Sequence, residues 1–114
     1  MSSPPRTLRC SRTSGGAVVL RPPEFDCGSV TQAREEMLIL LNRGAASLLV
    51  DLADCSAVCA CCGVPALVRV FRRARALGTA FHVIAPRDAR ARRPLDDARR
   101  VSREPFPLVS TSEA

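Results

Sequence analysis

The sequence contains no tryptophan, no tyrosine and no lysine, and it has only four phenylalanines and one histidine. A core built from it must therefore be mainly aliphatic. The net charge is +6, but nucleic-acid surfaces combine positive charge with stacking rings, which this chain lacks. No apolar run approaches the roughly 20 residues of a membrane span, and the first residues include no apolar signal segment. We therefore expect a cytoplasmic protein that binds neither nucleic acid nor membrane.

Signatures of catalysis are also missing. With a single histidine there is no Ser-His-Asp arrangement, no pair of carboxylates stands in a glycine-framed pocket, and no G-x-x-x-x-G-K-[ST] phosphate loop occurs. We expect a non-enzyme that carries no cofactor.

The 114 residues suffice for one domain with one core. Residues 1–15 are rich in Ser, Pro, Arg and Gly, which is typical of a loose leader. The domain is expected over residues 16–110, followed by a short tail over 111–114. We expect the domain to be a monomer.

Hydrophobic periodicity predicts alternating strands and helices. The apolar runs AVVL (17–20), SLLVDLA (47–53) and AFHVIA (80–85) are typical of strands, and the second indicates a central strand covered on both faces. Helical spacing extends from Ser29 to Arg43, where Ser29 and Gln32 match a capping box, and again from Val64 to Gly78. Residues 87–100 predict a third helix with a weak apolar face. This alternation favours an α/β domain with a mixed or mostly parallel sheet.

Four short motifs in this order resemble the STAS domain of bacterial anti-sigma factor antagonists. They are an E-F-D turn at Glu24, Phe25 and Asp26, the following first helix, the strand end DLA (51–53), and GVPALVRVFRRARALG from Gly63 to Gly78. The resemblance implies a single STAS-like domain with helices packed against its sheet. It also implies that the chain regulates transcription by sequestering an anti-sigma factor of the histidine-kinase-like ATPase type. The implied contact surface and switch loop comprise Asp26, Val58, Cys59, Ala60, Cys61, Cys62, Gly63 and Val64.

The family's phosphorylation motif, D-S-[ST]-G, lies just before the second helix. Aligned on Gly63, its first two positions hold Ala60 and Cys61, so Cys61 occupies the place of the phosphoacceptor. Counted forward from Asp51, the same positions fall on Cys59 and Ala60. Neither alignment leaves a hydroxyl, so we expect no phosphoacceptor at the usual site and no phosphorylation switch there.

The cluster from Cys55 to Cys62 permits three interpretations. The cysteines can be small fillers of a buried turn. Cys61 or Cys62, at a helix N-terminus, can have a lowered pKa and sense redox state within a signalling or scaffolding STAS module. Four thiolates, with His82 nearby, can instead bind zinc, but adjacent Cys61 and Cys62 are expected to point apart and the run lacks two separated knuckles. We therefore expect no metal, and a small zinc-binding protein remains the less favoured alternative.

Overall fold

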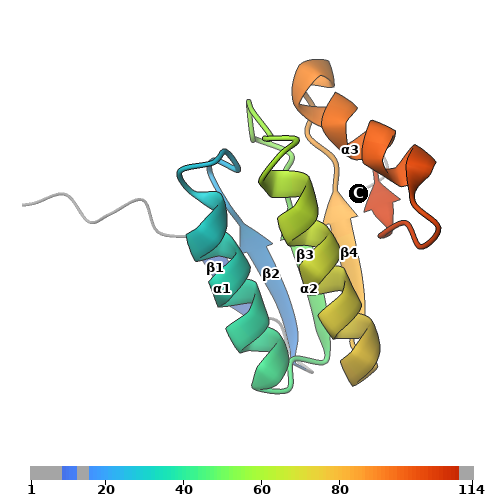
Figure 1. The fold of residues 1–114 in the computed structure, drawn as a ribbon. Coiled ribbons are helices and arrows are strands. Elements are labelled where there is room, and N and C mark those ends of the chain that lie inside the picture. Colours follow the sequence, from blue (N-terminus) through green and yellow to red (C-terminus); the bar gives the residue numbers. More distant parts are fainter. Residues whose placement is uncertain (1–8, 13–15, 111–114) are drawn as a thin grey trace, which may run out of the picture.

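A five-stranded sheet organises the chain in the computed structural model, which describes residues 9–12 and 16–110 (Figure 1). The strands are β1 (Arg9–Arg12), β2 (Ala17–Arg21), β3 (Ser47–Asp51), β4 (Ala80–Ile84) and β5 (Leu108–Val109). They lie in sequence order, with β1 antiparallel to β2 and the other neighbours parallel. The predicted α/β class with a mostly parallel sheet is confirmed.

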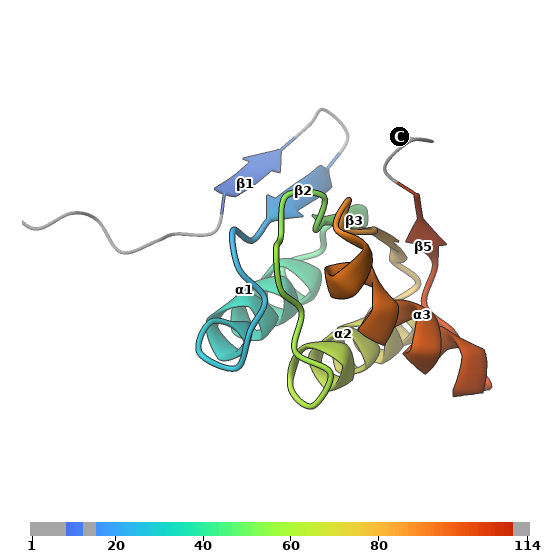
Figure 2. The ribbon, with the colours of Figure 1, turned by 90° about the horizontal axis from the view of Figure 1, so that it is seen from above.

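Three helices connect the parallel strands: α1 (Val30–Asn42), α2 (Gly63–Leu77) and α3 (Ala89–Val101). Each connection steps to the next strand in the same direction, and crossovers of one hand then place all helices on one face. Figure 2 shows this arrangement, with α1 and α2 side by side under the sheet and α3 beside α2. No helix in the described residues is both long enough and apolar enough to cross a membrane.

The core lies between the sheet and these helices. Leu20, Val50 and Val83 are fully buried on neighbouring strands, against Met37 of α1 and Leu67 of α2. The residues between them along the strands, such as Leu49, are only partly buried, and His82 is exposed. The prediction that residues 47–53 are covered on both faces is therefore wrong, because every described helix lies on the same side of the sheet.

The helix ends differ from the sequence-based expectation in one detail. Ser29 is the N-cap of α1, but its side chain makes no capping hydrogen bond to the helix. Its hydroxyl instead donates to Asp26 Oδ1 at 3.1 Å, so the predicted capping box does not form. The predicted stop of the second helix is confirmed, since Gly78 follows α2 with φ of 72°, a conformation that favours glycine.

Part of the predicted leader is structured. Residues Arg9–Arg12 form β1, which pairs with β2 from Arg9↔Arg21 to Arg12↔Val18. The expectation of a loose leader is therefore wrong for these four residues. The rest of the leader (1–8 and 13–15) and the predicted tail (111–114) lie outside the described residues.

Candidate functional site

Two loops meet at the carboxyl edge of the parallel strands, where α/β proteins commonly bind their ligands (Figure 1). One is the turn 22–29 between β2 and α1, and the other is the loop 52–62 between β3 and α2. They are joined by backbone pairing, because Phe25 and Val58 form an isolated parallel bridge. The Cys59 N–H also donates to the Phe25 carbonyl at 3.1 Å.

The buried ring of Phe25 determines how closely the start of α2 can approach the turn 22–29. Its side chain is fully buried, and an added Cβ on Gly63 would lie 2.9 Å from the ring carbon Cδ2. The start of α2 can therefore approach the turn this closely only with glycine at position 63. Gly63 N–H and Val64 N–H both donate to the Cys59 carbonyl, at 2.8 and 3.2 Å, which ties the loop to the helix.

Asp26 organises the turn that precedes α1. Its Oδ1 accepts hydrogen bonds from the Ser29 hydroxyl and from the backbone N–H groups of Gly28 and Ser29, at 3.0 to 3.1 Å. The Ser29 hydroxyl is the main reason that the pKa of Asp26 lies below its ordinary value, and the two backbone donors add to it. Asp26 is therefore a structural residue of the turn, with this oxygen already engaged by local donors.

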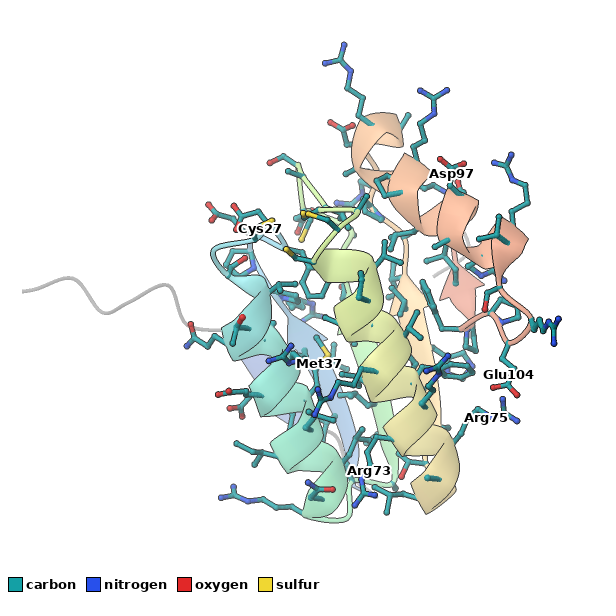
Figure 3. All side chains as sticks on the ribbon, in the orientation of Figure 1. Cys27, Met37, Arg73, Arg75, Asp97 and Glu104 are labelled. Carbon is teal, nitrogen blue, oxygen red and sulfur yellow. The ribbon has the colours of Figure 1, made fainter. Side chains whose placement is uncertain are left out.

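Four cysteine sulfurs gather where the two loops meet, one from the turn and three from the loop. Cys27, Cys59, Cys61 and Cys62 place their Sγ atoms within 4.8 Å of one another. Figure 3 shows Cys27 next to other sulfur atoms at the ends of α1 and α2. The five pairs in hydrogen-bonding contact are separated by 2.9 to 3.7 Å.

The set of cysteines that the sequence suggests as a ligand group is wrong in one member. Cys55 is buried away from the cluster, where its thiol donates to the Pro22 carbonyl at 3.1 Å, and Cys27 takes its place. The prediction that adjacent Cys61 and Cys62 point apart is also wrong, since their sulfurs are 3.7 Å apart. His82 lies exposed on β4 and is not a member of this group. The filler interpretation fits Cys55 best, since it is the buried member of the run from Cys55 to Cys62.

Among the four thiols, Cys59 has a pKa that is clearly lowered. Hydrogen bonds from Cys27 and Cys61 lower the pKa of Cys59 to about 6, helped by the backbone N–H groups of Cys61 and Cys62. The same contact with Cys59 raises the pKa of Cys27 and of Cys61, because each stabilises its neighbour's thiolate as a donor. The expectation of a lowered pKa at Cys61 is therefore wrong.

Two further signals in the sequence point to this arrangement. Cys59 and Cys62 have C-x-x-C spacing, which is common in metal knuckles and redox pairs. Cys27 directly follows the E-F-D turn, which the family resemblance places near the switch loop. It lies 32 residues from Cys59, so only the fold brings their sulfurs together.

An open groove adjoins the loop. Two neighbouring hollows share Ala60 and Val64, and one of them continues along α2 while the other extends to α3. Their walls are partly apolar, with Val68 and the largely exposed Val101, and arginines rim them. The charged lining residues are Arg69, Arg72, Arg90 and Arg93, together with one acidic residue, Asp97. Val58 and Gly63 are buried under the loop, whereas Ala60 and Cys61 are exposed. The exposed face thus joins a short loop to a basic, partly apolar groove.

Solved structures with a similar fold include anti-sigma factor antagonists. A Thermotoga maritima protein described as a candidate antagonist has a TM-score of 0.75 at 16% identity, over 93% of this chain and 89% of its own. The antagonist SpoIIAA in its unphosphorylated form has a TM-score of 0.71 at 16% identity, over 94% and 91%. An antagonist from Mycobacterium paratuberculosis has a TM-score of 0.69 at 21% identity, over 95% and 90%.

No family model and no curated protein matches the sequence. At identities this low the structural likeness establishes the fold, and it confirms the predicted STAS-like domain.

Proposed function

We propose that the chain is an anti-sigma factor antagonist that binds an anti-sigma factor of the histidine-kinase-like ATPase type, so that a sigma factor is released. The observation that supports this most is the likeness of fold to such antagonists over nine-tenths of the chain. The function is regulatory binding rather than catalysis, exerted by a monomer in the cytoplasm.

The binding surface in this proposal is the exposed loop 59–62 together with the groove beside it. Ala60 belongs to both and is exposed, and Val64 continues the apolar floor into α2. The arginine rim would attract an acidic partner and speed its encounter, since charge steering acts mainly on association rates. An apolar centre surrounded by a polar rim is the usual arrangement of a protein interface.

The loop carries no hydroxyl from Val58 to Gly63. A phosphoryl group at a helix N-terminus would add close to two negative charges in the middle of this surface. Because no acceptor is present there, the chain would stay in the partner-competent state whatever the kinase activity of the partner. We therefore expect a constitutive binder.

Affinity capture tests this proposal. The tagged protein is incubated with lysate of its own host, with ATP or with ATP depleted, and partners are identified by mass spectrometry. Recovery of a kinase-like anti-sigma factor in both conditions is expected, with no phosphate incorporated into the peptide that contains residues 58–63. Failure to recover such a partner in either condition, or phosphorylation of this loop, would contradict the proposal.

A matched pair of variants locates the surface. Ala60→Arg places a charged side chain at the exposed junction of loop and groove, and it should weaken capture at least about tenfold, as substitutions at the centre of an interface do. Leu77→Arg makes the same change at the other end of α2, where the leucine is also exposed, and it should leave capture unchanged. Equal effects of the two variants would place the interface elsewhere.

A further inference from the structure

We propose that Cys27, Cys59, Cys61 and Cys62 together bind one zinc ion. This inference is independent of the proposed function, because it rests on the geometry of the thiols alone. Cys27 comes from the turn before α1 and the other three from the loop before α2. All four sulfurs lie within 4.8 Å of one another, so a single ion can contact every one of them.

The sulfur–sulfur distances suit a tetrahedral site. With Zn–S bonds of about 2.3 Å, the sulfurs of a regular tetrahedron lie about 3.8 Å apart. Cys61 is 3.7 Å from both Cys27 and Cys62, and the shorter pairs need to open by less than about 1 Å to reach this value. All four are free thiols, and even the two closest pairs, at 2.9 Å, are far from the roughly 2.05 Å of a disulfide.

The backbone holds the ligand-bearing loop in place without the ion. The Cys59 N–H donates to the Phe25 carbonyl at 3.1 Å, and the Cys59 carbonyl accepts from the N–H groups of Gly63 and Val64 at 2.8 and 3.2 Å. Cys27 follows Phe25 by two residues, so the buried ring positions both ligand segments. Such outer contacts orient metal ligands and maintain affinity.

Two helix N-termini adjoin the cluster. Cys62 is the N-cap of α2, and Cys27 lies two residues before Ser29, the N-cap of α1. The first turn of neither helix contains an acidic residue. The Asp26 carboxylate already accepts the N–H groups of Gly28 and Ser29 before α1, so the favourable positive charge comes mainly from the N-terminus of α2. Each Zn–S bond forms as a thiol gives its proton to solvent, and the remaining double negative charge lies between two helix N-termini.

The chemistry selects zinc among common metals. Four thiolates in tetrahedral array are typical of zinc or iron–sulfur sites. A multi-iron cluster separates its cysteines by its own inorganic core, whereas these four sulfurs fit around one ion. Four protein ligands close the site, as in structural zinc centres. The ion would join the turn 26–29 to the loop 59–62, at the edge of the groove described above.

Metal content and cobalt spectroscopy test the site. The full chain is purified under reducing conditions without chelator, and its zinc is measured by mass spectrometry. One equivalent of zinc per chain is expected, and Co²⁺ added to the metal-free protein should give the intense visible absorption of tetrahedral thiolate coordination. Zinc far below one equivalent after reconstitution, with no such absorption, would overturn the proposal.

Two cysteine variants distinguish the proposed ligands from their neighbours. Cys27→Ser removes an exposed sulfur without touching the core, and it should weaken zinc binding by more than about 100-fold, beyond what loss of an outer-shell contact costs. Cys55→Ser changes a cysteine of the same loop that lies outside the cluster, and it should keep full affinity. The reverse pattern would overturn the assignment.

The redox interpretation of the same cysteines gives a different result. Native mass spectrometry of the protein purified anaerobically without chelator should show the mass of the reduced chain plus one zinc ion. A chain that lacks zinc and is lighter by the hydrogens of one or two disulfides would overturn the metal site and favour a redox sensor.

Discussion

At the scale of single residues, Gly63 places the tightest limit on the site. An added Cβ would lie 2.9 Å from Phe25 Cδ2 and 3.2 Å from the Phe25 carbonyl oxygen. The phenylalanine has no room to retreat, because it is fully buried in the core. A side chain at position 63 must therefore push apart the two loops that carry the cysteines.

We expect Gly63→Ala to lower the free energy of unfolding by about 1–3 kcal/mol, the usual cost of overpacking a well-filled core. Urea denaturation followed by circular dichroism measures it. Gly28→Ala is the matched control, since its added Cβ meets only Asp26 Oδ1 at 3.5 Å, an ordinary contact. The control should stay within about 0.5 kcal/mol of the parent. If both variants had the same urea midpoint of unfolding as the parent, the role assigned to Gly63 would be contradicted.

The individual cysteines show how far residue-level patterns reach. Clustering in the sequence marks Cys59, Cys61 and Cys62 as a group, and the structure keeps them together. The sequence also groups Cys55 with them, because closeness along the chain does not tell which way a side chain points. Cys55 points into the core toward Pro22, and Cys27 enters from a distant segment. Cys27 joins the cluster in place of Cys55 because the turn and the loop pair at Phe25 and Val58, a tertiary contact that the sequence pattern does not reveal.

At the scale of secondary-structure elements, α3 depends on very few apolar side chains. Its sequence is dominated by arginine and aspartate, and only Ala91 and Leu95 are buried. Asp88 caps its start by accepting hydrogen bonds from the N–H groups of Arg90 and Ala91. The weak apolar face that the sequence predicts is therefore real, and one leucine supplies most of the contact with the core.

We expect Leu95→Ala to lower the free energy of unfolding by about 2–5 kcal/mol, as other buried leucine truncations do. Amide hydrogen exchange in α3 should also become faster than in α1 and α2. Val101→Ala in the same helix is the control, because that side chain is 85% exposed, and it should have almost no effect. If Leu95→Ala left both the stability and the exchange of α3 unchanged, another contact would have to hold the helix.

Elements with strong periodicity are predictable from the sequence, and weakly patterned ones are not. The three helices and the three central strands begin and end within about two residues of their expected bounds. β1 escapes prediction because RCSR has no apolar alternation, and its place is determined by pairing with β2. The prediction that both faces of β3 are covered fails for a related reason. An apolar strand indicates burial, but the handedness of the crossovers decides which face the helices cover.

At the scale of the whole molecule, the site results from the topology. Parallel strands in sequence order bring the loops after β2 and β3 to one edge, and the start of α2 packs closely against Phe25 of the first loop. The order of the family motifs along the chain is enough to indicate this edge. The cluster of four sulfurs is not predictable in the same way, since it requires the turn and the loop to be placed to within a few ångströms.

A zinc ion that binds the folded chain and not the unfolded chain must stabilise the whole domain against unfolding. At a free zinc concentration about 100 times the dissociation constant the gain is about 2.7 kcal/mol. For a domain of this size, that corresponds to roughly 10 °C in the unfolding temperature. Adding a chelator should therefore lower the unfolding temperature of the parent chain by about this amount, measured by calorimetry under reducing conditions. The ligand variant Cys27→Ser should unfold at the same temperature with or without chelator, while Cys55→Ser should respond as the parent does.

If chelator left the unfolding temperature of the parent chain unchanged, no ion would join the two loops. An equal response in Cys27→Ser would mean that the stabilising metal lies elsewhere. Because this measurement involves no partner, its failure would leave the proposed antagonist function standing, and a failed capture experiment would leave the metal site standing.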